Sequence, residues 1–340
     1  MTTSKKIGFA VIGLGAIAQS SVLPSLAKHK RARLVALVSR DKKKAQRLAR
    51  KHKAKFAYTN EELSSCLANP EVDALFIATP PGEHASATIA AARAHKHVLC
   101  EKPLTASAEQ SAAMVEACRQ HGVVLMTAYR KYFEPSSLFL KKLIQQGHLG
   151  RIDLIHTSFS EMYRPGISQP WLVEPELAGG GPLMDLGIYC VNTNRWLMDE
   201  DPVEVSAQSW TNDTARFKRV EEGITFRLRF PSDAVLQGSS SYNTAPASFI
   251  FVSGSKGWAS LSPAYSFEFE RRVVATIGKR HIDKKFKIID EFAPEFDAFI
   301  SAIQTGRPLA PDGAQGHRDM VILDAIYRAA RERQPIAIRY

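Results

Sequence analysis

The sequence has few cysteines, and none of them form a metal-binding or cross-linking pattern. Its 340 residues contain four, without Cys-x-x-Cys spacing: Cys66, Cys100, Cys118 and Cys190. Zinc sites and the disulfide frameworks of small secreted domains both need closely patterned cysteines. We therefore expect reduced thiols that fill the core, and no metal site.

Long apolar runs are also missing. No stretch of about twenty residues is apolar enough to span a bilayer. The sequence begins Met1-Thr2-Thr3-Ser4-Lys5-Lys6 and then enters an apolar strand, so we expect no export segment. These features predict a cytoplasmic protein that does not bind membranes. The same start offers no arm to wrap a nucleotide, which favours a cofactor that exchanges between turnovers.

Acidic residues are fewer than basic ones, with 34 Asp and Glu against 45 Lys and Arg and a formal net charge of +11. A basic excess is one property of nucleic-acid-binding proteins. Here the excess is concentrated in the first sixty residues, where a predicted site for the phosphates of a bound nucleotide explains part of it. We do not expect nucleic acid as a partner.

That phosphate site is a glycine-rich turn after the apolar run Ile7–Ile12. The turn reads Gly13-Leu14-Gly15-Ala16-Ile17-Ala18, and a second apolar run, Leu34–Val38, follows at the distance a βαβ unit requires. Spaced glycines let the backbone approach a pyrophosphate, whose charge then sits at the start of the next helix. The turn predicts a dinucleotide site that includes Gly13, Gly15, Ala16 and Ile17. A purely structural glycine turn is the alternative.

The end of the second strand favours one dinucleotide over another. An acidic residue there binds the ribose 2′-hydroxyl of NAD, whereas a basic one accommodates the 2′-phosphate of NADP. The chain has Ser39 and Arg40 at this point, with Lys44 one helical turn later. We therefore expect NADP(H) to be preferred over NAD(H). Asp41 is the exception, since a shift of one residue would place its carboxylate where NAD needs it.

Alternation of strands and helices predicts a doubly wound parallel sheet in the first part of the chain. Strands are expected at 7–12, 34–38, 74–78, 97–100 and 123–126, and helices at 83–95 and 107–120. After about residue 130 the pattern changes to alternating strands of a mostly antiparallel open sheet, closed by helices near 292–304 and 314–331. We predict an α/β protein with a nucleotide-binding domain at 1–128 and an α+β domain at 129–340.

The carboxyl ends of parallel strands form the ligand crevice of such a fold. They carry Thr79-Pro80-Pro81, Glu101-Lys102-Pro103 and Tyr129-Arg130. Lys102 follows a buried strand directly, which favours a catalytic role over that of an ordinary surface lysine. Pro103 stiffens this turn, and Glu101 is placed to orient its neighbour.

A second polar segment follows a flexible glycine triplet, Gly179-Gly180-Gly181. Spacings of four and seven residues place Asp185, Tyr189 and Asn192 on one face of the next helix. The remaining residues of this helix are apolar or small. The polar face is therefore expected to line a wet cleft, with Asp185 and Tyr189 as site residues.

Together these segments give the chain a family resemblance over essentially its whole length. It resembles the Gfo/Idh/MocA oxidoreductases, and among them the glucose-fructose oxidoreductase branch. The matching segments are Gly13–Ala18, Thr79–His84, Glu101–Pro103, Ala128–Arg130 with Phe133–Pro135, and Gly179–Asn192. Two departures are that many members have histidine where Tyr189 stands, and that Leu172 follows Trp171 where relatives often carry arginine.

The resemblance implies a Rossmann domain and a C-terminal α/β domain whose open sheet commonly forms subunit contacts, hence a homodimer or homotetramer. It also implies a pyranose sugar or related polyol that is oxidised or reduced by a nicotinamide cofactor. His84 enters as a cofactor-side residue on this ground, and Arg130 and Trp171 as residues that position cofactor or substrate.

The chemistry requires a base near the hydroxyl that loses its proton. We expect Tyr189 to be this base. A free tyrosine has a pKa of about 10, and the ammonium of Lys102 would favour the phenolate. Asp185 would orient the sugar through neighbouring hydroxyls.

Two other functions remain open from the sequence. One is a ketosugar reductase that acts on a nucleotide-linked or amino sugar. The other is a non-catalytic NADP-binding redox regulator, which gives no reason for Lys102, Asp185 and Tyr189 to be present together. The sugar, the carbon and the preferred direction of reaction are not determined.

Overall fold

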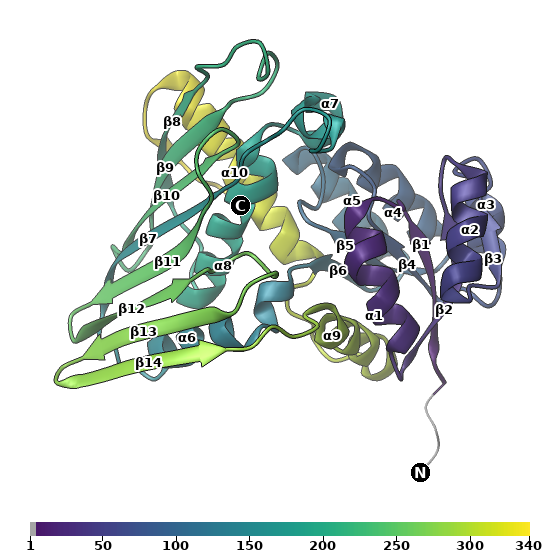
Figure 1. The fold of residues 1–340 in the computed structure, drawn as a ribbon, viewed down its shortest axis with the longest axis horizontal. Coiled ribbons are helices and arrows are strands. Elements are labelled where there is room, and N and C mark those ends of the chain that lie inside the picture. The colour runs from purple at the N-terminus through teal and green to yellow at the C-terminus, as the bar shows by residue number, and fades with distance from the viewer. Residues whose placement is uncertain (1–4) are drawn as a thin grey trace. The chain divides into compact units, whose positions relative to one another are not determined.

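The computed structural model describes residues 5–340 of the chain (Figure 1). These residues form two compact units, and neither is one continuous range. The first combines Met1–Arg130 with Asp290–His317, and the second combines Lys131–Ile289 with Arg318–Tyr340. Residues 1–4, where the expectation about the start of the chain falls, lie outside the described residues.

The first unit is built on a six-stranded parallel sheet. Its strands are β1 (Ile7–Ile12), β2 (Ala32–Val38), β3 (Phe56–Tyr58), β4 (Ala74–Ile77), β5 (His97–Glu101) and β6 (Leu125–Ala128), in the order β3-β2-β1-β4-β5-β6. Strands covered on both faces consist of continuous apolar residues, as β1 and β4 do. The order reverses direction at β1, so the ligand crevice lies beyond the carboxyl ends of β1 and β4. The predicted doubly wound fold is confirmed.

Helices connect these strands. They are η1 (Ala18–Val22), α1 (Leu23–Lys28), α2 (Lys42–His52), α3 (Leu63–Ala68), η2 (Pro81–Glu83), α4 (His84–Arg93) and α5 (Ala108–Gln120). A distant helix, α9 (Phe292–Thr305), also belongs to this unit. Its Phe296 ring lies 5.4 Å from that of Phe9 and 5.7 Å from that of Phe76, centroid to centroid. The core of the first unit therefore includes residues of α9, which come after residues 131–289 of the second unit in the sequence.

The second unit contains a nine-stranded sheet. Its strands are β7 (Ile152–Ser160), β8 (Glu204–Trp210), β9 (Gly223–Arg229), β10 (Val235–Ser241), β11 (Ala247–Gly254), β12 (Gly257–Ser262), β13 (Arg271–Ile277), β14 (Arg280–Phe286) and β15 (Ile336–Ala337), in the order β14-β13-β12-β11-β7-β10-β9-β8-β15. β7 and β10 pair in parallel, and the other neighbours are antiparallel. The predicted mostly antiparallel sheet is confirmed, and the hairpin β13–β14 forms one end of it.

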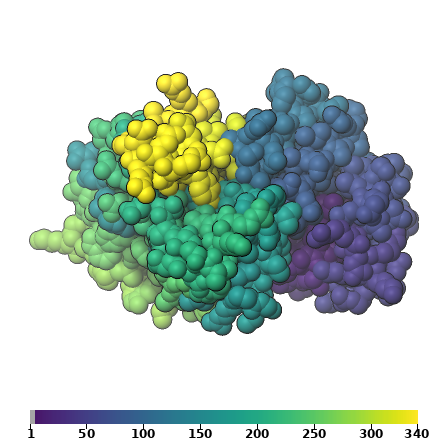
Figure 2. All heavy atoms as spheres, turned by 90° about the horizontal axis from the view of Figure 1, so that it is seen from above, coloured from purple at the N-terminus to yellow at the C-terminus, as the bar shows by residue number. Residues whose placement is uncertain are grey.

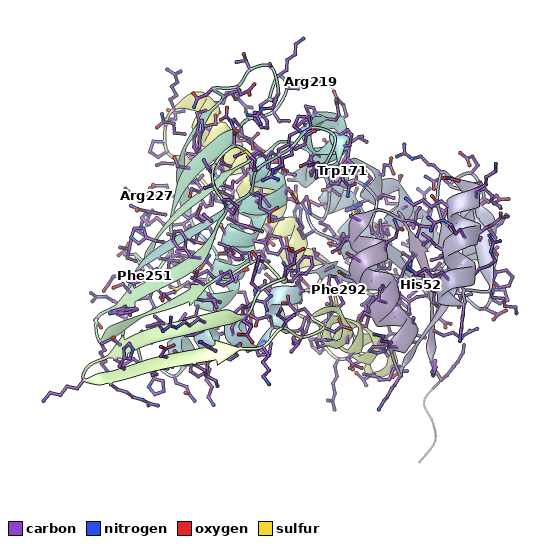
Figure 3. The ribbon with its side chains drawn as sticks, viewed as in Figure 1. His52, Trp171, Arg219, Arg227, Phe251 and Phe292 are labelled. Carbon is purple, nitrogen blue, oxygen red and sulfur yellow. The ribbon has the colours of Figure 1, made fainter. Side chains whose placement is uncertain are left out.

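One face of this sheet carries helices and the other is open. The helices of the unit include α6 (Pro135–Gln145), η4 (Pro170–Val173), α7 (Pro175–Ala178), η5 (Leu183–Gly187) and α8 (Ile188–Met198), and α10 (Gly313–Glu332) leads into it. Helices α6 and α8 pack on the sheet (Figure 1). Arg227 and Phe251 lie on the open face (Figure 3). The last residues of the chain, yellow in Figure 2, lie beside the green strands of the same unit, where β15 pairs with β8.

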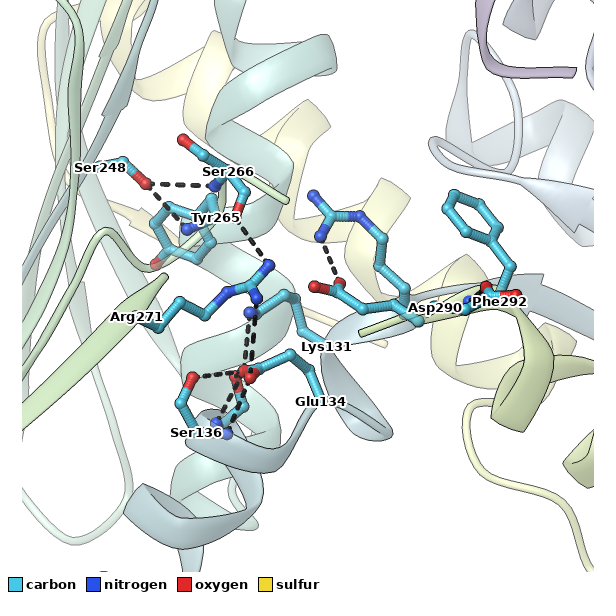
Figure 4. A network of polar contacts seen from close by, with 12 residues as sticks. Lys131, Glu134, Ser136, Ser248, Tyr265, Ser266, Arg271, Asp290 and Phe292 are labelled. Atoms are coloured by element: carbon cyan, nitrogen blue, oxygen red, sulfur yellow. Dashed lines mark hydrogen bonds and ion pairs between the residues drawn. The ribbon is translucent and has the colours of Figure 1, made fainter. Parts of the chain in front are cut away.

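A buried ionic cluster fixes the start of α6. Glu134 caps this helix by accepting hydrogen bonds from the backbone N–H groups of Ser136 and Ser137 at 2.8 and 2.9 Å, and its carboxylate lies 3.0 Å from the ammonium of Lys131 (Figure 4). Burial raises the pKa of Glu134, but Lys131, Ser136 and Arg271 outweigh it and lower the pKa to about 2. The Phe133–Pro135 segment of the resemblance therefore has a structural role.

All four cysteines are free thiols in the core, as their spacing predicts. Burial raises the pKa of Cys66, Cys118 and Cys190 to about 12. None of the helices within residues 5–340 combines the length and apolarity that crossing a bilayer requires.

Candidate active site

The glycine turn of the first unit is shaped by close backbone contact. Gly13 has a φ of +88°, and a Cβ there would lie 2.4 Å from the carbonyl carbon of Ala78 at the end of β4. Ala18 is fully buried at the third position of the motif, where only a small residue lets the helix approach the sheet. Gly15 and Ile17 are partly exposed, and Ala16 is exposed. This turn fits a dinucleotide, because it opens a helix and leaves its own backbone accessible.

The segment after β2 contains both candidate contacts to the cofactor ribose, Asp41 on the one hand and Ser39 with Arg40 on the other. The Asp41 carboxylate accepts a hydrogen bond from the backbone N–H of Lys44 at 3.0 Å and caps α2. The Ser39 hydroxyl accepts one from the backbone N–H of Asp41 at 3.2 Å, so its own proton remains available to a ligand. Arg40 is exposed and has no hydrogen bond or ion pair with any residue of the described chain. The Asp41 carboxylate therefore has a structural role as the cap of α2, and the choice between NADP and NAD stays a prediction.

The end of β4 presents a polar atom without a partner. The side-chain oxygen of Thr79 is buried and has no hydrogen-bond partner within residues 5–340. Pro80 follows it, partly exposed. A buried hydroxyl of this kind is normally satisfied by protein, water or ligand, so the segment fits the cofactor side of the crevice. His84 is fully buried behind it.

The turn after β5 holds Lys102. The Glu101 carboxylate accepts a hydrogen bond from the backbone N–H of Lys102 at 3.2 Å, and the Lys102–Pro103 peptide bond is cis. Lys102 is partly exposed, whereas Pro103 and Leu104 are buried. The expected arrangement, a lysine presented by a stiff turn at the carboxyl end of a buried strand, is what this unit contains.

A group of buried ionisable residues in the same unit joins Arg130 to the first turn of α9. Arg130 forms a buried ion pair with Glu291, with 2.5 Å between Nη1 and Oε2. Glu295 is fully buried, and neither of its carboxyl oxygens has a hydrogen-bond partner in the part of the chain described. Burial, with added repulsion from Glu101 and Glu291 that Arg130 only partly offsets, raises the pKa of Glu295 well above its ordinary value.

The raised pKa of Glu295 predicts a stability that falls as pH rises. Above about pH 4.3 the unfolded chain releases this proton while the folded chain keeps it, so ionisation favours unfolding until the folded pKa is passed. Replacing Glu295 with neutral glutamine removes this effect. We expect Glu295→Gln to come close to the wild type in melting temperature at pH 4 and to exceed it at pH 8, by about 2–4 °C for each kcal/mol recovered.

Differential scanning fluorimetry at the two pH values measures this difference. The matched control is Glu109→Gln, which changes an exposed carboxylate of α5. An increase in melting temperature that is the same at both pH values would show that Glu295 does not hold a proton in the folded chain.

In the second unit, the glycine triplet allows close packing. A Cβ on Gly180 would lie 2.0 Å from the hydroxyl of Tyr327, and one on Gly181 would lie 2.4 Å from the carbonyl oxygen of Glu221. The carboxylate of Glu221 accepts hydrogen bonds from the N–H groups of Gly181 and Leu183 at 3.0 and 3.1 Å and from Tyr327 at 2.9 Å. Gly180 and Gly181 are therefore packed against Glu221 and Tyr327, whereas Gly179 has a left-handed φ of +83°; the expected flexibility of the triplet stays a prediction.

The helix that follows carries the two expected site residues. The hydroxyl of Tyr242 donates a hydrogen bond to the carboxylate of Asp185 at 3.0 Å. Burial, and then Asp185 itself, raises the pKa of Tyr242 well above its ordinary value, so Tyr242 stays a donor. The ring of Tyr189 packs against Phe159 and Tyr265, with centroid distances of 5.5 and 5.8 Å. Both Asp185 and Tyr189 are thus held by neighbours from the sheet side.

Asn192 does not share their surroundings. It is buried, and its amide donates hydrogen bonds to Asp319 at 2.7 Å and to Tyr132 at 3.4 Å. The expected polar face is wrong at this position. Asn192 differs because Asp319 of α10 and Tyr132 cover its amide; the π-helix Leu183–Gly187 precedes both Tyr189 and Asn192 and shifts them together relative to Asp185.

Trp171 lies in η4, beside α7 (Figure 3). Its indole N–H donates a hydrogen bond to the side chain of Gln169 at 2.6 Å, and the residue is partly exposed. Its expected contact with cofactor or substrate stays a prediction.

Each unit thus brings together part of the predicted set. The first unit gathers the residues around its strand ends, Gly13, Gly15, Ala16, Ile17, Ser39, Arg40, Lys44, Thr79, Pro80, His84, Glu101, Lys102 and Arg130. The second holds Asp185, Tyr189 and Trp171. The sequence analysis missed the residues that support them, Glu221, Tyr242, Tyr327, Glu291 and Glu295, because they come from distant segments. No group of three or more His, Cys, Asp or Glu side chains within residues 5–340 is arranged to hold a metal ion.

A six-stranded doubly wound sheet with a glycine-rich first turn is the arrangement of a dinucleotide-binding Rossmann fold. Residues 7–129 match the oxidoreductase family with an NAD-binding Rossmann fold (GFO/IDH/MocA), and residues 138–260 match the GFO/IDH/MocA C-terminal domain. The chain belongs to this family. The predicted enzyme class, an NAD(P)-dependent oxidoreductase acting on CH–OH groups, is confirmed.

Three relatives with similarity along the whole chain are named as sugar oxidoreductases. The chain is 30% identical over 339 residues to a D-xylose 1-dehydrogenase [NADP(+)] of Haloarcula marismortui, covering 99% of this chain and 94% of the relative. It is 32% identical over 327 residues to D-xylose 1-dehydrogenase (NADP(+)) 2 of Haloferax volcanii, covering 95% and 97%. The crystal structure of an aldose-aldose oxidoreductase from Caulobacter crescentus matches with a TM-score of 0.92 and 34% identity, covering 98% of this chain and 100% of that one.

Proposed function

We propose that this protein is an NADP-dependent oxidoreductase that transfers a hydride between the nicotinamide and a pyranose sugar or a related polyol or ketosugar. The observation that carries the proposal is the pair Asp185 and Tyr189, one helical turn apart on a helix whose start is fixed by Glu221. A carboxylate that can hold sugar hydroxyls and a phenol that can exchange a proton are the two groups this reaction needs. The similarity to two D-xylose dehydrogenases supports the same substrate class.

The residues of the first unit fit NADP. When bound, this cofactor supplies an acceptor or donor of hydride at its nicotinamide ring. We assign its binding to the glycine turn and to residues at and after the strand ends of this unit, namely Gly13, Gly15, Ala16, Ile17, Ser39, Arg40, Lys44, Thr79, Pro80, Glu101 and Arg130, and we keep Trp171 of the second unit as a further candidate. Ser39 and Arg40 bind the 2′-phosphate, which supports NADP over NAD because Asp41 is engaged in capping α2.

The proton is moved by residues of the chain. Tyr189 accepts the proton of the sugar hydroxyl as the carbonyl forms, and returns it in the reverse reaction. Lys102 donates a hydrogen bond to the same oxygen and stabilises the negative charge that develops there. Asp185, held by Tyr242, accepts hydrogen bonds from neighbouring hydroxyls and orients the sugar.

The open face of the nine-stranded sheet supports a homodimer or homotetramer, as proposed from the sequence. A shallow groove crosses it, lined by residues that include His156, Gln208, Arg227 and Phe249. Phe249 is 38% exposed at this face. An aromatic side chain beside Arg and Gln on an otherwise uncovered sheet is typical of an interface between subunits.

The proposed preference for NADP predicts a selective defect in Arg40→Ala. Loss of a charge-assisted pair with a phosphate costs about 1.5–3 kcal/mol, which corresponds to about a 10- to 150-fold higher KM for NADP. The KM for NAD should stay within about twofold, since NAD has no 2′-phosphate. Steady-state kinetics with both cofactors measure this difference.

The matched control is Lys43→Ala, which removes a positive charge from an exposed position on α2. It should change neither KM by more than about twofold, because an exposed charge contributes little at physiological salt. Equal losses for NADP and NAD in Arg40→Ala would contradict the assignment of the 2′-phosphate site.

The function itself is tested by absorbance near 340 nm, with the purified chain and a panel of aldoses, polyols, ketosugars and nucleotide-linked sugars supplied with NADP or NAD. The proposal predicts that reduced cofactor accumulates with at least one pyranose, faster with NADP. Tight NADPH binding without turnover in either direction would instead show a non-catalytic regulator. Turnover only with nucleotide-linked sugars would reassign the substrate.

A further inference from the structure

The glycine-rich turn of the first unit is closed by the side chain of a residue one helical turn later. The amide nitrogen of Gln19 lies 3.0 Å from the carbonyl oxygen of Leu14 and 3.3 Å from that of Gly15. An amide nitrogen carries two hydrogens, so it can donate to both carbonyl oxygens at once. Gln19 belongs to η1 and therefore connects the helix to the turn that precedes it.

The helix itself uses only one of these two carbonyl groups. The backbone N–H of Gln19 donates a hydrogen bond to the carbonyl of Gly15 at 3.2 Å, and residues 16–28 continue as a helix through η1 and α1. The first N–H groups of a helix have no partner inside it, and they are the groups that bind anions. Leu14 lies before this helix, and the side chain of Gln19 gives its carbonyl a donor.

The two carbonyl groups that face Gln19 also fix the direction of two N–H groups. The peptide bonds Leu14–Gly15 and Gly15–Ala16 are trans. In a planar trans peptide the C=O and the N–H point in opposite directions. Because both carbonyl oxygens face the Gln19 amide, the N–H groups of Gly15 and Ala16 point away from it. Gly15 is partly exposed and Ala16 is exposed, so a ligand can reach this part of the turn.

The orientation of these peptide groups matters because a phosphate accepts hydrogen bonds and is repelled by carbonyl oxygens. A peptide group that turned over would present an oxygen where the pyrophosphate is proposed to lie. Gly15 offers little resistance to such a rotation, since glycine has no Cβ to restrict φ and ψ. The hydrogen bonds from Gln19 oppose it.

We propose that Gln19 is a positioning residue of the cofactor site: its amide holds the carbonyl oxygens of Leu14 and Gly15, so that the N–H groups of Gly15 and Ala16 face the pyrophosphate. The proposal rests on the proposed binding of NADP at this turn. Gln19 acts through the turn and contacts neither the sugar nor the 2′-phosphate. Its contribution is therefore the same for NADP and NAD, which share the pyrophosphate.

The variant Gln19→Met tests this role, because methionine keeps the side-chain length without the amide. Isothermal titration calorimetry is carried out with NADPH, with NADH and with 2′-AMP, which has the 2′-phosphate but no pyrophosphate. The dissociation constants of NADPH and NADH should rise by the same factor, about 5- to 100-fold, as the loss of two neutral hydrogen bonds does. That of 2′-AMP should stay within about twofold, and kcat at saturating NADP should fall less than about threefold.

The matched control is Ser20→Ala, which changes the next residue of the same helix. The Ser20 hydroxyl is exposed and lies 3.2 Å from that of Ser21. This variant should keep all three dissociation constants within about twofold of wild type. Hydrogen–deuterium exchange should be faster in residues 14–18 of Gln19→Met and unchanged in β1 and α2, which shows that the variant is folded and that only the turn is loosened.

Unchanged affinity for NADPH and NADH in Gln19→Met would overturn the proposal, whatever the exchange rates. A loss that extends equally to 2′-AMP would overturn it in favour of a general structural role, and a loss confined to NADPH would place the effect at the 2′-phosphate. If the wild type binds NADPH but turns over no sugar, the proposed function fails, while the titrations still decide the role of Gln19. A wild type that binds neither NADPH nor NADH would refute the cofactor site and this proposal together.

Discussion

Tyr189→Phe is expected to lower kcat by about 10²- to 10⁴-fold, the usual contribution of a positioned acid or base. The substitution removes only the hydroxyl, so the ring keeps its packing against Phe159 and Tyr265. The KM for NADP should change less than about threefold, since the phenol acts on the sugar. Steady-state kinetics with saturating sugar and NADP, together with a melting curve, measure both effects.

Tyr265→Phe is the matched control for this prediction. Tyr265 belongs to the same aromatic cluster, and its hydroxyl shares a hydrogen bond with that of Thr157 at 2.5 Å. Burial raises the pKa of Tyr265 well above its ordinary value, so it keeps its proton. This variant should lose stability and retain kcat within about threefold. Comparable kcat values for Tyr189→Phe and the wild type would exclude Tyr189 as the acid or base.

Lys102→Met is expected to lower kcat by about 10²- to 10³-fold, as the loss of one donor to a developing oxyanion does. Methionine keeps most of the side-chain length without the ammonium group. The NADPH dissociation constant, measured by nucleotide fluorescence, should stay within about fivefold of wild type. Pre-steady-state absorbance at 340 nm then shows whether the slow step is hydride transfer.

The control is Lys96→Met, immediately before β5, where the ammonium donates a hydrogen bond to the carbonyl of Val72 at 2.8 Å. This variant should be less stable but fully active. If Lys102→Met raised the sugar KM and left kcat unchanged, Lys102 would bind the substrate equally in ground and transition states, and the proposed role at the reacting oxygen would be wrong.

The parts of the fold that were predictable from sequence depend on local patterns. The glycine turn and apolar strands such as Ala74–Ile77 identify the parallel sheet, because buried strands read as continuous apolar runs. The cap formed by Asp41 also follows a local rule, since an Asp three residues before an unpaired helical N–H is a common N-cap. That rule was available from the sequence and would have identified Asp41 as a helix cap.

Other features depend on contacts that no local pattern contains. Helix α9 belongs to the first unit because aromatic side chains such as Phe296 pack against β1 and β4. The strands β13 and β14 carry charged residues at most exposed positions, which masks their alternation. Asn192 was misplaced because helical spacing does not show that Asp319, 127 residues later in the chain, accepts a hydrogen bond from its amide and helps to bury it.

The support around the candidate site was also beyond the sequence. Glu221 lies 40 residues from Gly181 in the chain, and Tyr242 lies 57 residues from Asp185. These partners follow only from the pairing of the strands of the second sheet with its helices. Sequence analysis therefore identified the residues expected to react, but not the residues that hold them.

The most direct test of the account is isotope transfer from sugar to cofactor. The purified chain is incubated with NADP and D-xylose deuterated at C1, and the reduced cofactor is analysed by mass spectrometry. The account predicts one deuterium in the NADPH that forms, no such product with Tyr189→Phe on the same timescale, and faster formation with NADP than with NAD. If no deuterium reaches the cofactor from this or any other pyranose deuterated at its carbinol carbons, hydride transfer between a sugar and NADP is not the function of this protein.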